Sequence, residues 1–273
     1  MVTTAGDDQG REAKSPDFSR FRVLVVEDDM VNREVLIGLL ERLKVVAPAV
    51  AEDGIEALDR FSEKEFDLVL MDCQMPGMDG FEATRQWRRR ETEEGKGAPA
   101  VIVAVTAFAM TGDREKCLAC GMDDYLSKPV NGRALEGVFA KWLGGRGRAG
   151  VFAPTSPVES PLLDDGALKG LREDLGPETL AAIVPQFLSL LPRRTEEIIS
   201  VAGEGKADEL GRAAHTLKGN ALQFGLIHLG DICLELERLG KADRVDESLD
   251  RLPELEDAVA MSMGALKTWL QEH

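Results

Sequence analysis

Carboxylate side chains end two of the most apolar runs in this sequence of 273 residues. Glu27 closes the run FRVLVVE and is followed by Asp28 and Asp29, and Asp72 closes the run FDLVLMD. Carboxylates brought together would repel one another and raise each other's pKa unless a cation lay among them. Oxygen ligands that leave coordination positions open suit Mg²⁺, which completes its shell with water and phosphate oxygens. These residues therefore predict a magnesium site.

A hydroxyl and an ammonium group end two further segments. Thr106 closes AVIVAVT, and Lys128 closes DYLSK directly before a proline. Beside carboxylates that bind magnesium, both groups could contact a phosphoryl group, so the set predicts phosphoryl transfer to a carboxylate. Alternatively, each acidic residue on its own caps a helix or begins a turn. The full set of acidic, Thr and Lys-Pro positions favours the transfer site.

A second reactive group stands far downstream. His215 lies four residues from Gly211 on one side and four from Gly219 on the other, positions that share its helical face. Because a glycine inside a helix costs roughly 1 kcal/mol relative to alanine, the pair suggests that a large partner approaches the imidazole. Lys218 provides positive charge one turn away, where a phosphoryl group on the imidazole would need it. Neutral imidazole is a usable nucleophile at cellular pH.

The helix expected to carry His215 spans about residues 206 to 223. Its apolar residues follow the spacing of a buried stripe: Leu210, Ala214, Leu217, Ala221 and Phe224. At about 100° per residue, His215 falls roughly 120° to 160° from most of this stripe, which predicts that it faces solvent. The alternative is a surface histidine with incidental glycines, and this is our interpretation of His228 and His273.

The first half of the chain must bring the carboxylates, Thr106 and Lys128 to one place. Its apolar runs alternate with segments of helical periodicity, as expected of an α/β fold with a doubly wound, flavodoxin-like parallel sheet of five strands. The strands are expected at residues 21–27, 45–50, 66–72, 100–106 and 124–128. In such a sheet, ligands bind outside the carboxyl ends of the strands, where these side chains would meet. Pro48 favours an edge position for the second strand.

The second half reads as an all-α antiparallel bundle. A stretch rich in Gly, Pro and Ser precedes it, and short breaks at glycines separate its amphipathic segments. The helices are expected near residues 164–174, 177–190, 193–203, 206–223, 226–240 and 246–271. The predicted organisation is a disordered leader, a first domain, a flexible linker and a helical domain, at residues 1–20, 21–143, 144–161 and 162–273.

Composition excludes several classes of protein. The formal net charge of −16 argues against nucleic acid as a partner, because binding to phosphates needs clustered basic residues. No apolar run reaches the roughly 18 residues of a membrane span, so we expect no membrane insertion and a cytoplasmic location. Cys117 and Cys120 lack a second pair of Cys or His nearby to complete a zinc site, and two small residues on a helix are the simpler interpretation.

Four segments of the first half resemble the signature segments of the response-regulator receiver domain, in order and at the right intervals. They are VLVVEDDMVNREV, LVLMDCQMPGMDG, VIVAVTAFAM and GMDDYLSKPV. The resemblance implies that Asp72 accepts a phosphoryl group and that Glu27 and Asp28 bind Mg²⁺ with the backbone carbonyl of Gln74. Glu27 stands where many family members have aspartate.

The same resemblance assigns roles to the other side chains. It implies that Thr106 and Lys128 contact the phosphoryl group, that Thr106 and Tyr125 form a switch pair, and that the bond before Pro129 is cis. A phosphohydrolase of the D-x-D type would carry a second aspartate two residues after the first. Because Gln74 stands there, the sequence argues against a dedicated hydrolase.

The segment AAHTLKGNALQFG resembles the A-H-x-L-K-G segment of the histidine phosphotransfer (HPt) domain, and LGDICLELERLGK resembles the helix that follows it. The resemblance implies that His215 carries phosphate, supported by Lys218, and that Gly219 clears the approach of a partner. Asn220 stands where a smaller residue is common.

No ATP-binding segment or helix-turn-helix is apparent, and GGRGRAG lacks the G-K-[ST] of a phosphate loop. We therefore expect a phosphorelay carrier, not an enzyme. Its partners would be a sensor histidine kinase or upstream HPt domain and a downstream response-regulator receiver. A phosphorylation-switched binding module and a phosphate sink are the alternatives. The partner of His215 could be Asp72 of the same chain or another receiver, and the initial Met1 favours a free-standing protein.

Overall fold

The computed structural model describes residues 18–95, 99–106, 111–144 and 162–273, with side chains of residues 111–114 excepted. Most of the predicted leader and almost all of the predicted linker lie outside the described residues. Phe18, which we assigned to the leader, is buried and packs edge-on against Phe139. The packed part of the first domain therefore begins before residue 21.

Five parallel strands form the sheet of the first domain, in the order β2-β1-β3-β4-β5. They are β1 (Val23–Val26), β2 (Ala49–Ala51), β3 (Leu68–Asp72), β4 (Val101–Thr106) and β5 (Asp124–Ser127). Every residue of β1 and β3 is buried, as their near-continuous apolar sequences predict for strands covered on both faces. Pro48 directly precedes the edge strand β2, which confirms the predicted edge position.

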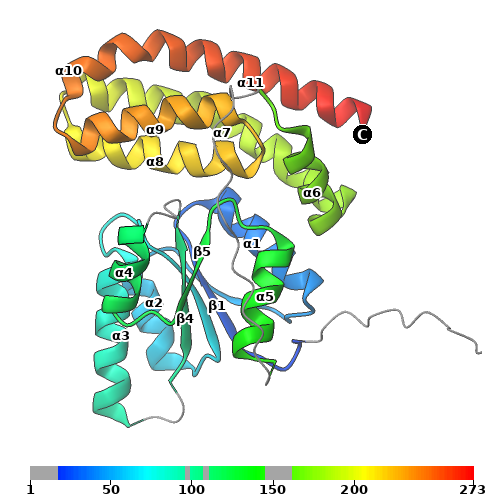
Figure 1. Ribbon diagram of the computed structural model, residues 1–273, viewed down its shortest axis with the longest axis vertical. Helices are drawn as coiled ribbons and strands as arrows, with labels where there is room; N and C mark the ends of the chain where they lie inside the picture. Colours follow the sequence, from blue (N-terminus) through cyan, green and yellow to red (C-terminus); the bar gives the residue numbers. More distant parts are fainter. Residues whose placement is uncertain (1–17, 96–98, 107–110, 145–161) are drawn as a thin grey trace, which may run out of the picture.

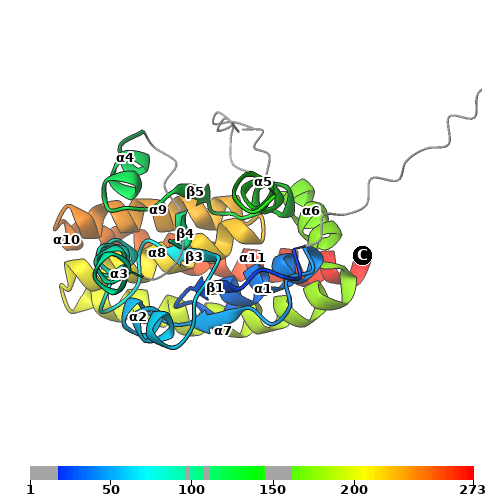
Figure 2. The same ribbon diagram turned by 90° about the horizontal axis from the view of Figure 1, so that it is seen from below.

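Helices cover both faces of this sheet (Figures 1 and 2). The helices of this domain are α1 (Met30–Arg42), α2 (Gly54–Glu63), α3 (Gly80–Glu94), α4 (Thr111–Ala119) and α5 (Gly132–Trp142). Alternate residues of β1 enter separate apolar clusters, one shared with α1 and α5 and the other with α2 and α3. Asp29, Asp53, Asp79 and Asn131 each cap the helix that follows. The predicted doubly wound α/β fold is confirmed.

The second half of the chain is helical throughout its described residues. Its elements are α6 (Asp165–Leu175), α7 (Pro177–Gly203), α8 (Ala207–Gln223), α9 (Ile227–Lys241), α10 (Val245–Ser248), the 3₁₀ helix η1 (Leu249–Arg251) and α11 (Leu252–Glu272). The expected break at Gly176-Pro177 is present, with Gly176 at a φ of 82°. None of the described helices is both long enough and apolar enough to cross a membrane.

Two of the predicted helix boundaries are wrong. The break expected near residue 191 does not occur, because α7 continues through Pro192. A proline inside a helix removes one backbone hydrogen bond, but Leu188, Leu191 and Thr195 on either side of it are buried and hold the helix in the bundle. The last predicted helix, 246–271, is instead divided into α10, η1 and α11.

The bundle lies across the end of the sheet at which the strands finish (Figure 1). Helix α1 of the first domain contacts α6, α7 and α8 of the second. Apolar residues of both domains belong to one continuous cluster, which includes Leu36 and Leu39 of α1 with Leu171 of α6 and Leu180 of α7. The helical domain therefore covers the edge at which the candidate site residues were expected.

Candidate functional site

Three carboxylates meet at the carboxyl ends of β1 and β3. These strands are neighbours in register, with Val26 opposite Met71, so that the residues after them lie side by side. Glu27, Asp28 and Asp72 each offer an oxygen atom within 4.8 Å of the others. Within the described part of the chain, this is the group of acidic, His and Cys side chains placed closely enough to share a metal ion. The convergence that the sequence predicted is confirmed.

Burial makes the ionisation of these carboxylates costly. Burial, together with the neighbouring charge of Asp72, raises the pKa of Glu27 to about 8 and that of Asp28 to about 6. The Nζ atom of Lys128 lies 2.7 Å from Asp72 Oδ2 and 2.8 Å from Glu27 Oε2. Burial alone would lower the pKa of Lys128, but the two ion pairs raise it. One ammonium cannot neutralise three carboxylates, and this all-oxygen set with excess negative charge fits Mg²⁺.

The remaining residues predicted for the pocket surround this cluster. The backbone N–H of Gln74 donates to Asp72 Oδ1 at 3.0 Å, which fixes the loop after β3 against the carboxylate. Thr106, at the end of β4, is buried and pairs in register with Ser127 of β5. Tyr125 is half-buried on β5, opposite Ala104. Thr106 and Tyr125 thus lie on adjacent strands, and the bond between Lys128 and Pro129 is cis as expected.

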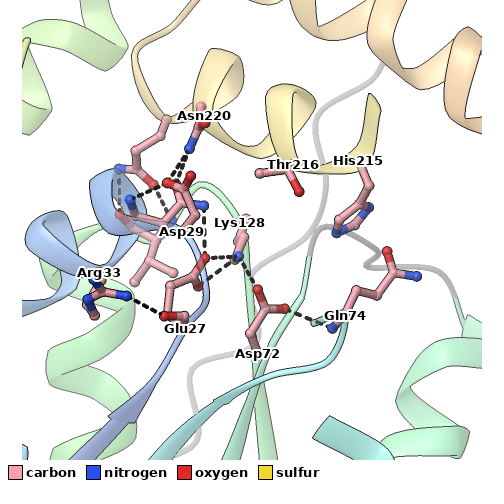
Figure 3. Close-up of polar contacts among 12 residues, drawn as sticks. Glu27, Asp29, Arg33, Asp72, Gln74, Lys128, His215, Thr216 and Asn220 are labelled. Carbon is pink, nitrogen blue, oxygen red and sulfur yellow. Dashed lines mark hydrogen bonds and ion pairs between the residues drawn. The ribbon is translucent and has the colours of Figure 1, made fainter. Parts of the chain in front are cut away.

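His215 lies on α8, as predicted, but the prediction that it faces solvent is wrong. Its exposed fraction is only 7%. Helix α9 packs along α8 on one side, and the first domain covers the other. Figure 3 shows the imidazole directed from α8 toward Asp72 and Gln74. The helical periodicity located the apolar stripe of α8, but His215 is buried by a domain that lies outside that helix.

Glu237 of α9 orients the imidazole, and the sequence analysis did not identify it. Its Oε1 atom lies 2.9 Å from His215 Nδ1, and the side chain is fully buried. Burial alone would raise the pKa of Glu237, but hydrogen bonds with His215, Lys218 and Lys241 lower it to about 2. The carboxylate is ionised and can only accept hydrogen bonds, so His215 Nδ1 carries the proton and Nε2 keeps its lone pair. The sequence did contain one indication of this role, because Glu237 is a charged residue within the apolar segment that includes Leu236 and Leu239.

Lys218 has a different position from the one that the sequence suggested. Its exposed fraction is 3%, and its ammonium group forms an ion pair with Glu237. We expected this charge beside a phosphoryl group on His215, whereas the structure places it against the carboxylate that holds His215. Burial lowers the pKa of His215 from its usual value, and Glu237 opposes part of this effect. The imidazole is therefore neutral near pH 7.

The two glycines beside His215 serve different neighbours. A Cβ added at Gly219 would lie 3.7 Å from Asn32 Nδ2 and 3.9 Å from Lys128 Cδ, both in the first domain. Gly211 lies against Gly240 of α9 and lines a pocket of about 330 Å³ with Gln74. Gly219 thus faces the first domain, while Gly211 faces α9, where the close packing of the two helices requires glycine at position 240.

The comparisons with known proteins agree with this geometry. Residues 23–139 match the family model of the response regulator receiver domain, and residues 182–269 match that of the Hpt domain. The chain is 35% identical over 254 residues to the sensor histidine kinase GacS of Pseudomonas protegens, which covers 90% of this chain and 27% of that protein. It is 29% identical over 241 residues to the signal transduction histidine-protein kinase BarA of Escherichia coli, which covers 85% of this chain and 25% of that protein.

The chain thus spans about a quarter of the length of these curated relatives. A solved structure of the receiver domain of the sensor histidine kinase PA1611 from Pseudomonas aeruginosa, with a magnesium ion in its active-site cleft, is 38% identical. The match covers 46% of this chain and 98% of that chain, with a TM-score of 0.41. The two family matches follow one another along the sequence and coincide with the two folds described above. The chain therefore belongs to the two-component signalling proteins, as a response regulator receiver domain followed by an Hpt domain, the domain pair of a phosphorelay.

Proposed function

We propose that this protein carries phosphoryl groups between partners through two residues, Asp72 of the receiver domain and His215 of the Hpt domain. The observation that carries the proposal is the placement of His215, which points from α8 toward the carboxylate cluster around Asp72 (Figure 3). A nucleophile and an acceptor that face each other in a buried space need little further reorganisation to react. Glu27, Asp28 and Asp72 would hold Mg²⁺, with the backbone carbonyl of Gln74 as a further ligand.

The bonds balance in a direct transfer. The lone pair on His215 Nε2 attacks the phosphorus of an aspartyl phosphate, the bond from phosphorus to the Asp72 oxygen breaks, and Asp72 regains its carboxylate charge. No proton has to leave the imidazole, because the Nδ1 proton remains on its hydrogen bond to Glu237. The ring becomes cationic when it is phosphorylated, and Glu237 stabilises this charge. The reverse steps load Asp72 from a phosphohistidine.

The surrounding residues stabilise the phosphoryl group on Asp72. Lys128 lies 2.7 Å from Asp72 and provides an ammonium group for the phosphoryl oxygens, and Thr106 provides a hydroxyl at the end of the neighbouring strand. When bound, Mg²⁺ would offset the combined negative charge of the carboxylates and the phosphoryl group. Lys218 acts through Glu237, by holding that carboxylate in the ionised state that orients His215. In this proposal Thr106 and Tyr125 report phosphorylation to the receiver surface.

The proposed partners are a sensor histidine kinase or an upstream HPt domain as donor, and a downstream response-regulator receiver as acceptor. The similarity to GacS and BarA, which are named as histidine kinases, supports partners of this class. In this scheme the chain is a cytoplasmic carrier that depends on another protein for the use of ATP.

Radiolabel transfer tests the proposal. The wild-type chain, Asp72→Ala and His215→Gln are labelled by a histidine kinase in the presence of Mg²⁺, and His228→Gln is the matched control. Phosphoaspartate is lost in alkali and phosphohistidine is lost in acid, so the label on Asp72 and the label on His215 are measured separately. We expect Asp72→Ala to abolish labelling by the kinase, and His215→Gln to remove only the alkali-stable label. Rapid loss of label from Asp72 without any alkali-stable label in the wild type would indicate a phosphate sink instead.

A further inference from the structure

Asn220 connects the helical bundle to the magnesium pocket of the receiver. It lies on α8, at a position where a smaller residue is common in the family, and it is fully buried. Its Nδ2 atom donates to Asp29 Oδ1 at 2.8 Å and to Asn32 Oδ1 at 3.0 Å, both in the receiver. Figure 3 shows Asn220 directed from α8 toward Asp29. An amide has two hydrogens for these two bonds, whereas the hydroxyl of a serine has one. Asn220 therefore makes a contact that a serine could not complete.

Asn32 extends this contact to Glu27. It lies in the first turn of α1 and is buried. Its Nδ2 atom donates to Glu27 Oε1 at 3.0 Å, while its Oδ1 atom accepts from Asn220. Hydrogen bonds thus run without interruption from Asp29 through Asn220 and Asn32 to Glu27, one of the carboxylates placed to hold a metal ion.

The carboxylates at the two ends of this series determine the orientation of both amides. A carboxylate that binds a metal ion is ionised and only accepts hydrogen bonds, so the amide nitrogen of Asn32 must face Glu27. The carbonyl oxygen of Asn32 then faces Asn220, whose other amide hydrogen bonds Asp29. Without Asn220, the buried oxygen of Asn32 would lose its donor, and the amide could turn away from Glu27. Asn220 therefore holds Asn32 in the orientation that suits an ionised Glu27.

The two oxygen atoms of Glu27 have different surroundings. Oε1 accepts from Asn32 Nδ2 at 3.0 Å and from Lys128 Nζ at 3.1 Å. Oε2 is buried 2.8 Å from Lys128 Nζ, and no hydrogen-bond donor among the described residues is aligned with it. The bonds to Oε1 thus leave Oε2 available to a metal ion. Loss of a residue that orients a metal-binding side chain typically weakens metal binding by about 10- to 100-fold.

Two other contacts join α7 and α8 to the receiver without involving Asn32. The guanidinium of Arg194, on α7, forms an ion pair with Asp29. The side-chain amide of Gln223, on α8, accepts the backbone N–H of Val130 and donates to the carbonyl of the same residue, each at 3.2 Å. Gln223 is buried. The effect of domain contact in general can therefore be measured separately from the effect of the bond to Asn32.

We propose that Asn220 is a positioning residue for the magnesium site of the receiver, so that docking of the helical bundle and binding of Mg²⁺ strengthen each other. The inference rests on the magnesium site proposed above and adds to it a residue of the other domain. With the bundle docked, Asn220 keeps Asn32 in place for Glu27. With Mg²⁺ bound, the ionised Glu27 favours the orientation of Asn32 that Asn220 recognises. Such a coupling must have the same magnitude in both directions.

Calorimetric titration of the full chain with Mg²⁺ alone tests this inference. The variants are Asn220→Ala, Asn32→Ala and the combination of the two. Gln223→Ala is the matched control, because it removes another buried amide of α8 whose hydrogen bonds to the receiver go to Val130. Asn220→Ser, which keeps one donor, provides a second and milder variant. Thermal unfolding verifies that each variant is folded, and small-angle scattering with and without Mg²⁺ reports how closely the domains are docked.

We expect Asn32→Ala to weaken Mg²⁺ binding about tenfold and Asn220→Ala about fivefold, with Asn220→Ser between Asn220→Ala and the wild type. The combined variant should bind Mg²⁺ as Asn32→Ala does, because Asn220 acts through Asn32. Gln223→Ala should stay within about twofold of the wild type. Mg²⁺ should make the wild-type chain more compact, and should do so less in Asn220→Ala.

Three results would overturn the inference: wild-type affinity in both Asn220 variants, an equal loss in Gln223→Ala and Asn220→Ala, or an effect of Asn220→Ala that persists undiminished when Asn32 is alanine. A wild-type chain that binds no Mg²⁺ would instead overturn the magnesium site of the proposed function.

Discussion

The Nδ1 atom of His215 lies 2.9 Å from Oε1 of Glu237, a fully buried carboxylate that also forms ion pairs with Lys218 and Lys241. The protein thus places a negative charge against the Nδ1 side of the imidazole. This arrangement has two effects that can be measured separately. It fixes the tautomer of His215, and in the proposed transfer it would stabilise the positive charge that the ring acquires on phosphorylation.

Glu237→Gln should slow phosphoryl transfer through His215 by about tenfold, because an amide can accept the Nδ1 hydrogen bond but cannot neutralise a cationic ring. The pKa of His215 should fall further, since Glu237 now raises it against the effect of burial. Nuclear magnetic resonance titration of the imidazole measures that pKa. Glu235→Gln, a change to a half-buried glutamate on the same helix, is the control. An unchanged His215 pKa in Glu237→Gln would contradict this account.

Binding of Mg²⁺ should depend on pH between about 6 and 8. The folded-state pKa values of Glu27 and Asp28, about 8 and about 6, lie above their usual values. Protons therefore compete with the metal as the pH falls through this range, and binding releases protons. A ligand that binds only the folded state raises the melting temperature by more when it binds more tightly. We therefore expect Mg²⁺ at about 10 mM, a roughly saturating concentration, to raise the melting temperature more at pH 8 than at pH 6. An equal rise at both pH values in the wild type would rule out this explanation.

The periodicity of apolar residues predicts which side chains of a helix or strand are buried within its own domain. Prediction from the sequence therefore succeeded where burial depends on that domain alone. The apolar runs of β1 and β3 gave the sheet, and parallel strands bring Glu27 and Asp72 to one edge. The burial of His215 could not be predicted in this way, because the receiver domain provides the covering surface. Glu237 was missed because a charged residue in an apolar stripe resembles an exposed residue until its buried partners His215 and Lys218 are known. The path of α7 through Pro192 likewise depends on tertiary packing.

Lys128→Met should destabilise the receiver strongly in the absence of metal. The ammonium is the cation that accompanies Glu27 and Asp72 in a buried pocket, and loss of one partner of a buried ion pair costs about 3 to 5 kcal/mol. Mg²⁺ should restore part of this loss by neutralising the same carboxylates. Urea denaturation with and without Mg²⁺ measures both effects. Lys169→Met, at an exposed lysine of α6, should leave stability almost unchanged.

Substitutions at Gly219 distinguish the stability of helix α8 from the close contact between α8 and the receiver domain. Alanine fits, because its Cβ would meet Asn32 and Lys128 at ordinary van der Waals distances of 3.7 and 3.9 Å. Gly219→Ala should therefore stabilise α8 by about 0.5 to 1 kcal/mol and leave transfer intact. Leucine also favours the helix, but its longer side chain must displace the receiver, and a misplacement of about 1 Å can slow a reaction about a hundredfold.

The measurements are thermal unfolding and the rate of label transfer between Asp72 and His215. Gly264→Leu is the matched control, because Gly264 is an exposed helical glycine on α11 with open space around its added Cβ. It should share the stabilising effect and keep the wild-type transfer rate. If Gly219→Leu transfers as fast as Gly264→Leu, the receiver does not approach His215 across Gly219, and the close contact of the two domains at this point has no part in the transfer.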